Sequence, residues 1–192
     1  MAEGPGPRAR AGNAKDFFEF LETFQPGTQA HLRRVLPPDV LQGLESATRV
    51  DWNDVETIDG PYVTAIVSWL GDERARDAWR EFTVKRFIHT PAIRALAEGA
   101  ARLFGVSVGS YVRMIPFAFQ QGFRNCGTAR VDLGPGEATV RMTFSEGFAR
   151  FEAYAVLLHG IFLGIFDLAR VEARLEFEPS FPERRLVATF RW

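Results

Sequence analysis

The chain has 192 residues, of which 46% are hydrophobic and 24% charged, which is typical of one globular domain with a sizeable core. Its formal net charge of −1, from 23 Lys and Arg against 24 Asp and Glu, excludes an overall positive field for nucleic acid or an anionic membrane. Cys126 is the only cysteine, which excludes an internal disulfide and favours a cytoplasmic location. We expect neither a signal segment nor a membrane-spanning helix.

The first residues differ in composition from the rest of the chain. Residues 1–13 are rich in Gly, Pro, Ala and Arg and have no periodic apolar positions, which is typical of a flexible tail. We expect residues 14–192 to form a single α+β domain, mainly helical over 14–126 and ββαββ over 127–192. The 18 phenylalanines predict a thick aromatic core, an apolar cavity or a surface that a partner covers.

Helical spacing of apolar residues dominates the first part of that domain. It predicts an N-terminal helical bundle, with helices over residues 14–24, 28–35, 38–48, 62–70 and 72–87. Thr90-Pro91 is typical of an N-cap followed by the first helical position, and predicts another helix that closes at Gly105. Ser107 would cap the last helix, which continues to Phe123 with a kink at Pro116.

From residue 127 onward, apolar and polar residues alternate as they do in half-exposed strands. The alternation predicts a long apolar helix between two hairpins: strands over 128–133 and 137–144, the helix over 148–167, and strands over 171–177 and 186–192. We expect a four-stranded antiparallel sheet with one face packed on the helix, while the strand order stays open. Gly160 and Gly164 would let the helix approach a neighbour closely.

The three histidines are separated, and none has another histidine three or four residues away. His31 lies on a polar helix face and His89 lies beside the Thr90-Pro91 cap, so both are interpreted as having no site role. His159 lies in the most apolar helix, where it could be an axial haem ligand, a polar contact for a ligand or a core histidine bonded to backbone. The core interpretation is favoured, and we expect neither a metal nor a cofactor.

Cys126 is the first candidate for a nucleophile, because a thiolate needs only a nearby base or helix terminus for activation. No catalytic motif surrounds Asn125-Cys126-Gly127, which instead predicts a helix-to-strand turn with a structural thiol. Gly134-Pro135-Gly136 precedes a strand, whereas phosphate-binding loops precede a helix. The paired carboxylates Asp51 and Asp54 are assigned to helix capping. No catalytic constellation is found, so the chain is expected not to be an enzyme.

Several short segments carry a family resemblance through their order and spacing. They are Leu36-Pro37, Val50-Asp51-Trp52, Ala101-Arg102-Leu103-Phe104-Gly105, Gln121-Gly122-Phe123-Arg124-Asn125-Cys126-Gly127, Tyr154 with Gly160 and Gly164, and a last strand ending in Trp192. Across Phe20 to Trp192 the chain resembles a paralogous family of uncharacterised myxobacterial, hence bacterial, proteins. That family is distantly similar to four-vinyl-reductase and haem-NO-binding-associated sensory domains. The resemblance implies a cytoplasmic, non-catalytic signalling module whose relatives bind small, often hydrophobic molecules.

Two functional hypotheses follow. The leading one is a sensory or ligand-binding module with an apolar pocket for a small hydrophobic molecule. The expected pocket residues come from two helices: Tyr111, Phe119, Phe123, Tyr154, Leu158, His159 and Phe162. The alternative is a protein-interaction module without a ligand, either a homodimer or an adaptor for a signalling protein. A homodimer could form through the helix of Gly160 and Gly164 or through an exposed sheet edge.

Overall fold

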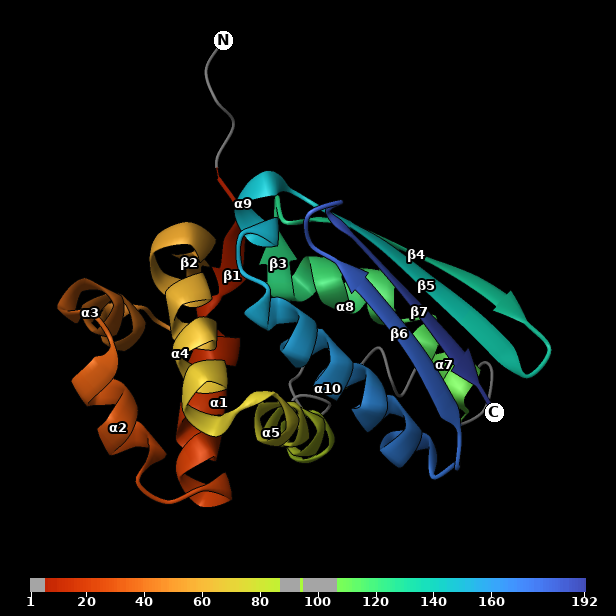
Figure 1. Ribbon diagram of the computed structural model, residues 1–192, viewed down its shortest axis with the longest axis horizontal. Coiled ribbons are helices and arrows are strands. Elements are labelled where there is room, and N and C mark those ends of the chain that lie inside the picture. The colour runs from red at the N-terminus through yellow and green to blue at the C-terminus, as the bar shows by residue number, and fades with distance from the viewer. Residues whose placement is uncertain (1–5, 87–93, 95–106) are drawn as a thin grey trace, which may run out of the picture.

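The structure, a computed structural model, describes residues 6–86, residue 94 and residues 107–192 (Figure 1). Its helical elements are α1 (Ala11–Phe24), α2 (Thr28–Val35), α3 (Pro38–Ser46), η1 (Val55–Asp59), α4 (Gly60–Leu70), α5 (Asp72–Lys85), α7 (Val108–Val112), α8 (Ile115–Gly122), α9 (Glu146–Ala149) and α10 (Ala153–Ala169). Its strands are β1 (Arg8–Arg10), β2 (Trp52–Asp54), β3 (Phe123–Arg124), β4 (Gly127–Gly134), β5 (Glu137–Phe144), β6 (Arg174–Ser180) and β7 (Arg185–Arg191).

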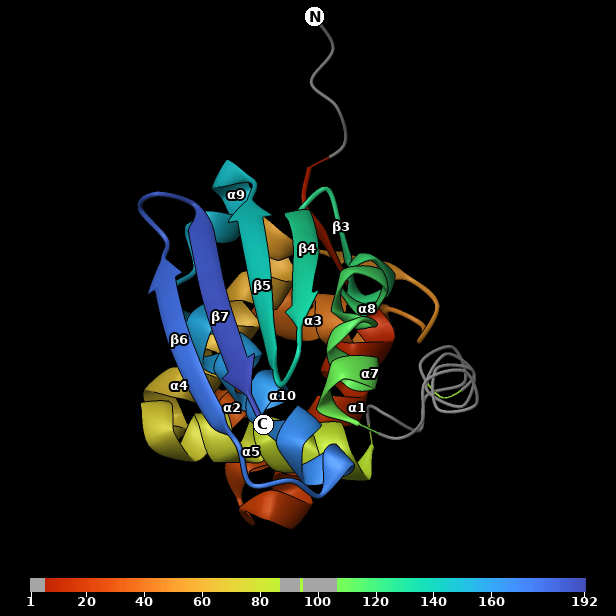
Figure 2. The ribbon, with the colours of Figure 1, turned by 90° about the vertical axis from the view of Figure 1, so that its right-hand side faces the viewer.

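The four C-terminal strands form one antiparallel sheet in the order β4-β5-β7-β6 (Figure 2). This confirms the predicted α+β class, the ββαββ order and the four-stranded antiparallel sheet. Val140 pairs with Ala188, and Met142 pairs with Leu186; all four are buried, because alternate residues of a strand share one face. α10 packs on this face, where the rings of Phe162 and Phe190 lie 5.5 Å apart.

The beginning of the chain differs from the predicted tail. Residues 8–10 form β1, the central strand of a small sheet with the order β2-β1-β3, and α1 begins at Ala11. Ala9 pairs with Asn53 on one side and with Phe123 on the other. A three-residue strand has too little alternation to be read from sequence, and its partners lie far along the chain.

Two predicted helices are each divided in two. The helix expected from Ser107 to Phe123 is α7 followed by α8, with Pro116 in the first turn of α8, where a missing N–H costs no hydrogen bond. The helix expected over 148–167 is α9 followed by α10. Between them the Phe151 ring packs over Gly60, where a Cβ would lie 2.6 Å from the ring. The predicted helix from Thr90-Pro91 to Gly105 lies outside the described residues.

The neighbour that approaches Gly160 and Gly164 is α5. A Cβ on Gly160 would lie 2.4 Å from the carbonyl oxygen of Arg76, and one on Gly164 would lie 3.0 Å from Thr83. The predicted close approach therefore occurs inside the chain (Figure 1). Because α5 covers the glycine face of α10, that face is not open to a second copy, and a homodimer stays a prediction. None of the helices that the structure describes is long and apolar enough to cross a membrane.

Candidate functional site

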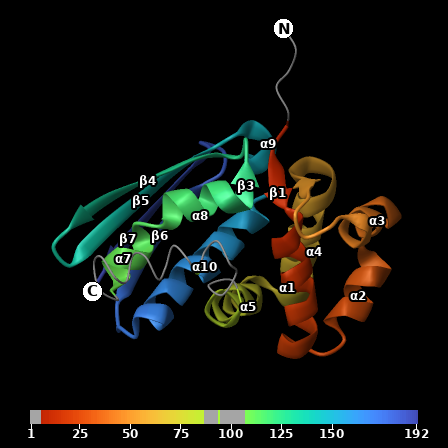
Figure 3. The same cartoon turned by 180° about the vertical axis from the view of Figure 1, so that it is seen from behind.

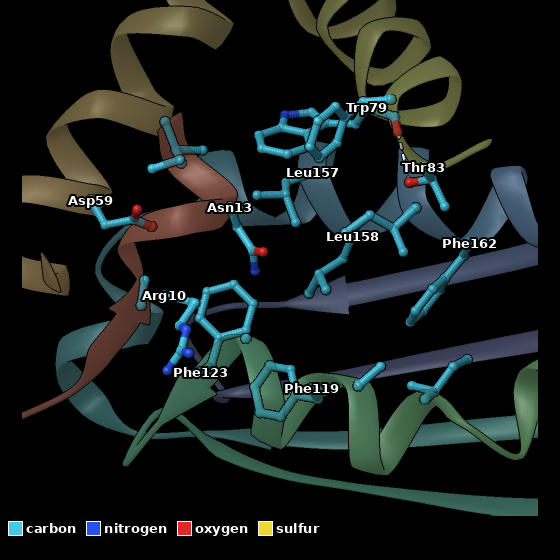
Figure 4. Close-up of a pocket in the computed structure, with 18 of the residues that line it drawn as sticks. Arg10, Asn13, Asp59, Trp79, Thr83, Phe119, Phe123, Leu157, Leu158 and Phe162 are labelled. Atoms are coloured by element: carbon cyan, nitrogen blue, oxygen red, sulfur yellow. Dashed lines mark hydrogen bonds between the residues drawn. The ribbon is translucent and has the colours of Figure 1, made fainter. Parts of the chain in front are cut away.

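A partly enclosed cavity of about 80 Å³ lies between the N-terminal helices and the ββαββ unit. Its walls come from β1, α1, η1, α4 and α5 on one side and from α8, β5 and α10 on the other (Figure 4). Seen from behind, α8 runs beside α10, with α1 and α5 close by (Figure 3). The lining is almost entirely apolar, so the binding free energy of a ligand would come chiefly from burial of its apolar surface.

Four of the seven predicted pocket residues lie on the wall of this cavity: Phe119, Phe123, Leu158 and Phe162. They come from the two helices predicted to enclose a pocket and from β3, which directly follows α8. The rings of Phe119 and Phe123 lie 5.2 Å apart and make an aromatic surface beside the aliphatic side of α10 (Figure 4). Binding of a ligand by these residues stays a prediction.

The other three predicted residues lie elsewhere. His159 faces β6, where its imidazole stacks on Phe177 at 4.4 Å; burial lowers its pKa, and nearby Arg76 lowers it further. Tyr111 is half-buried on α7 and packs against the core. Tyr154 is fully buried and stacks on Phe148 at 4.1 Å, behind the cavity wall.

Asp59 brings a carboxyl group to the apolar cavity. The Asp54 carboxylate accepts the N–H groups of Glu56 and Thr57 at 3.0 Å and so fixes the start of η1. η1 closes with wider turns than an α-helix and ends at Asp59, which is only 6% exposed and forms part of the wall.

The hydrogen bonding of Asp59 is incomplete. The hydroxyl of Tyr154 donates to Oδ2 of Asp59 at 2.6 Å, whereas no described group donates to Oδ1. Burial raises the pKa of Asp59 to about 6, and the Tyr154 hydrogen bond opposes that rise. A buried carboxyl with a spare acceptor oxygen, on the wall of an apolar cavity, is an arrangement typical of functional sites.

Asn13 adds a second polar group at the same end of the cavity. Its amide makes no hydrogen bond to the part of the chain that the structure describes, and Figure 4 shows it reaching into the space between Asp59 and Leu158. The amide nitrogen lies 3.3 Å from the position of a Cβ on Gly122. Neither polar residue was predicted from the sequence. Asn13 fell in the predicted tail, and Asp59 stands before Gly60-Pro61, where it has the pattern of an ordinary helix start.

Cys126 lies outside the cavity wall and is 1% exposed. Its sulfur lies 3.2 Å from the carbonyl oxygen of Arg124 and 3.5 Å from that of Arg8, so the single S–H can donate to either one, and burial raises the pKa of the thiol to about 12. A thiol with so high a pKa holds almost no thiolate at neutral pH, so it does not serve as a nucleophile in this state. Its position in the turn before β4 agrees with the predicted structural role.

Comparison with known proteins identifies the class of fold. The chain matches no family model and no curated protein. Solved structures of H-NOX domains do match it. At 10 to 12% identity, this likeness shows the fold alone. It supports a distant likeness to H-NOX and supports neither the myxobacterial family nor four-vinyl-reductase.

Three of these structures illustrate the match. A variant of H-NOX from T. Tengcongensis is 12% identical, with a TM-score of 0.58, over 95% of this chain and 96% of that chain. An H-NOX structure from work on heme distortion in that family is 12% identical, with a TM-score of 0.60, over 95% and 94%. A variant from K. algicida in the Fe(II) unliganded state is 10% identical, with a TM-score of 0.62, over 95% of each chain.

The expectation of a protein without a cofactor is contradicted by these neighbours. The T. Tengcongensis and K. algicida proteins are H-NOX domains, and structures of this family were solved to study heme distortion and heme redox potential. The expectation rested on the separated histidines and on the favoured core interpretation of His159, although the sequence also allowed His159 as an axial haem ligand and resembled haem-NO-binding-associated domains. Spacing along the chain does not reveal a pocket that assembles from distant elements.

The described residues of the cavity can be tested for their fit to haem. Haem iron is held in proteins by His, Cys, Met or Tyr, and the described wall holds only Tyr62 and Met142 of these types. The Tyr62 hydroxyl donates to the carbonyl oxygen of Ala14 at 3.2 Å, and burial raises its pKa. His159 faces away, and His89 lies outside the described residues. These described residues therefore do not fit haem.

Proposed function

We propose that this chain is a sensory module that binds a small, mostly apolar molecule in the cavity between α8, α10 and the N-terminal helices. The observation that carries the proposal is Asp59, a buried carboxyl on an apolar wall with one oxygen that accepts no hydrogen bond from the described residues. The H-NOX fold supports the sensory class, because one solved neighbour is described as an oxygen-binding H-NOX domain related to soluble guanylate cyclases.

The Oδ1 atom of Asp59 indicates which chemical group a ligand would need. A buried carboxyl costs free energy unless hydrogen bonds compensate its desolvation, and Tyr154 compensates only Oδ2. A ligand that carries a hydroxyl or amine group would donate to Oδ1 while its apolar body contacts Phe119 and Leu158. We therefore propose an apolar molecule with one hydrogen-bond donor. The Asn13 amide would offer a second polar contact beside it.

Native mass spectrometry of the purified full chain, with a denatured control and an absorption spectrum of the same sample, tests this function. We expect an extra mass that is lost on denaturation. Ala118→Leu, which fills the cavity from α8, and Asp59→Asn, which removes the negative acceptor, should both reduce the occupied fraction. Ala155→Leu, outside the cavity, and Asp39→Asn, on the exposed surface of α3, are the matched controls.

Two results would contradict the proposal. One is equal occupancy in Ala118→Leu and in the wild-type chain, since the ligand would then bind elsewhere. The other is a bound mass with a Soret band, which would identify haem, the group studied in the structural neighbours, as the occupant. That second result would keep the sensory class and replace the proposed ligand.

A further inference from the structure

One face of the small sheet β2-β1-β3 carries a group of charged residues. The pairings Arg8 with Asp54, Arg8 with Arg124, and Arg10 with Trp52 place these five side chains on the same side of the sheet, because directly paired residues of antiparallel strands point the same way. The opposite face holds Ala9, Asn53 and Phe123. We call the first group the arginine face.

The arginine face has unbalanced charge. It holds three arginines and one aspartate, and Arg8 lies 3.9 Å from the carboxylate of Asp54. Neither Arg10 nor Arg124 forms an ion pair with any carboxylate that the structure describes. Asp51 is close enough to Arg10 to interact electrostatically, but its carboxylate accepts the N–H of Thr48 at 2.6 Å. Two guanidinium groups are thus available to a partner.

Both guanidinium groups are held by the same indole. The central guanidinium carbon of Arg124 lies 4.0 Å from the ring centroid of Trp52, and that of Arg10 lies 5.1 Å from it. Such stacking reduces the number of side-chain conformations while leaving N–H donors at the guanidinium edge. The arginine side chains are therefore already restricted in the free protein, so binding of a carboxylate costs them less conformational entropy.

Arginines on the outer face of the large sheet behave differently. Arg191 binds Glu137 and Glu176, and Arg141 binds Asp132, all within salt-bridge distance. Arg191 and Arg141 therefore bind carboxylates of their own sheet, whereas Arg10 and Arg124 bind none among the described residues. In a chain with a net charge of −1, this local excess of positive charge is complementary to an acidic partner.

We propose that the arginine face is a docking site for an acidic segment of a partner protein, whose carboxylates bind Arg10 and Arg124. A polypeptide suits it better than a single small anion, because the two arginines come from different strands and a chain lying across the sheet can present successive carboxylates. The back of the same strands carries Ala9 and Phe123, which line the cavity. Because Arg10 also lines the cavity, a partner bound to this arginine would lie next to the ligand.

Fluorescence anisotropy with a labelled oligo-glutamate peptide and the full chain tests the site. We expect binding that weakens as salt is added, and a loss of at least about tenfold in affinity in Arg10→Gln/Arg124→Gln. Arg34→Gln/Arg130→Gln removes the same charge from positions outside the arginine face and should change affinity less than about twofold. Arg124→Lys should lose part of the affinity, because lysine keeps the charge without the planar fork.

Equal losses in the two double variants would overturn the site, because net charge alone would then explain binding. Absence of peptide binding would overturn it as well. Inorganic phosphate that competes as strongly as the peptide would overturn the assignment to a polypeptide. Circular dichroism of each variant checks that the fold is retained, and Arg124→Gln alone, at an exposed side chain, keeps the test valid if the double variant unfolds.

Discussion

Helix α10 meets two neighbours in opposite ways. Against α5 it packs so closely that Gly160 has no room for a methyl group, and Arg80 of α5 binds Asp167 through two hydrogen bonds of 2.6 Å. Toward α8 the same helix leaves a cavity of about 80 Å³ lined by Leu158 and Phe162. One contact has backbone nearly touching backbone, and the other has a void with a buried carboxyl at one end.

One helix thus has both a close-packed contact and a contact that leaves a void. Protein interiors are normally close-packed, so a void and a desolvated carboxyl both cost stability. The void and the desolvated carboxyl occur together at Asp59, whereas α5 and α10 pack closely. The cavity is therefore a local feature of an otherwise well-packed core. A local loss of stability of this kind is typical of a binding site.

The largest expected effect is on the close contact. Gly160→Val would force a branched side chain onto the carbonyl oxygen of Arg76, 2.4 Å from the new Cβ. We expect a loss of at least about 3 kcal/mol in the free energy of unfolding, measured by urea denaturation. Ala155→Val, on the same helix beside an open groove, should cost far less. Equal stabilities of the two variants would mean that α5 and α10 are not in close contact.

Asp59→Asn should stabilise the protein in a pH-dependent way. The carboxyl has a pKa of about 6 in the folded chain against an ordinary pKa of 3.8. The folded state therefore binds more protons than the unfolded state between these values, and stability falls as pH rises from about 4 through 6. The shift corresponds to about 3 kcal/mol above pH 6. We expect Asp59→Asn to raise the free energy of unfolding by up to that amount at pH 8 and to remove its pH dependence. If the pH dependence were the same in the variant, the Asp59 carboxyl would be hydrated and not buried.

Tyr154→Phe should have a smaller effect of the opposite sign. It removes the only described hydrogen bond to the Asp59 carboxyl while keeping the ring that stacks on Phe148. We expect a loss of about 2 kcal/mol at pH 8 and a further rise in the pKa of Asp59. Thermal denaturation at pH 5 and pH 8 measures both. A variant that loses the same stability at both pH values would show that the hydroxyl does not act through the carboxylate.

The smallest change in stability is expected for Ala118→Leu. The longer side chain enters the cavity rather than the packed core, so the free energy of unfolding should change by less than about 1 kcal/mol. Ligand occupancy should nevertheless fall strongly. A large destabilisation would indicate that the cavity cannot accept even a few added carbon atoms.

The fold could be predicted well from the sequence where one face of each element is polar. The period-2 alternation of β5 and β7 predicted the antiparallel sheet, and Gly160 predicted a close helix contact. α10 is different, because it is apolar nearly all round. Its sequence could not distinguish the cavity side, with Leu158, from the sheet side, with His159.

The candidate site was harder to predict, because its polar groups depend on contacts between distant segments. Asp59 is the buried last residue of η1, which takes wider turns than an α-helix, and its partner Tyr154 lies 95 positions along the chain. Asn13 reaches the cavity only because β1 pairs with β2 and β3 and so fixes the start of α1. Local pattern contains none of this information.

Whether the free oxygen of Asp59 binds a donor on the ligand can be measured by the carboxyl ¹³C titration of Asp59. The shift would be followed by NMR from pH 4 to 8, in the protein as purified and after unfolding, removal of the bound molecule and refolding. We expect a midpoint near 6 in the emptied protein and a lower midpoint in the occupied one, because a donor stabilises the carboxylate. The same midpoint in both samples would contradict it.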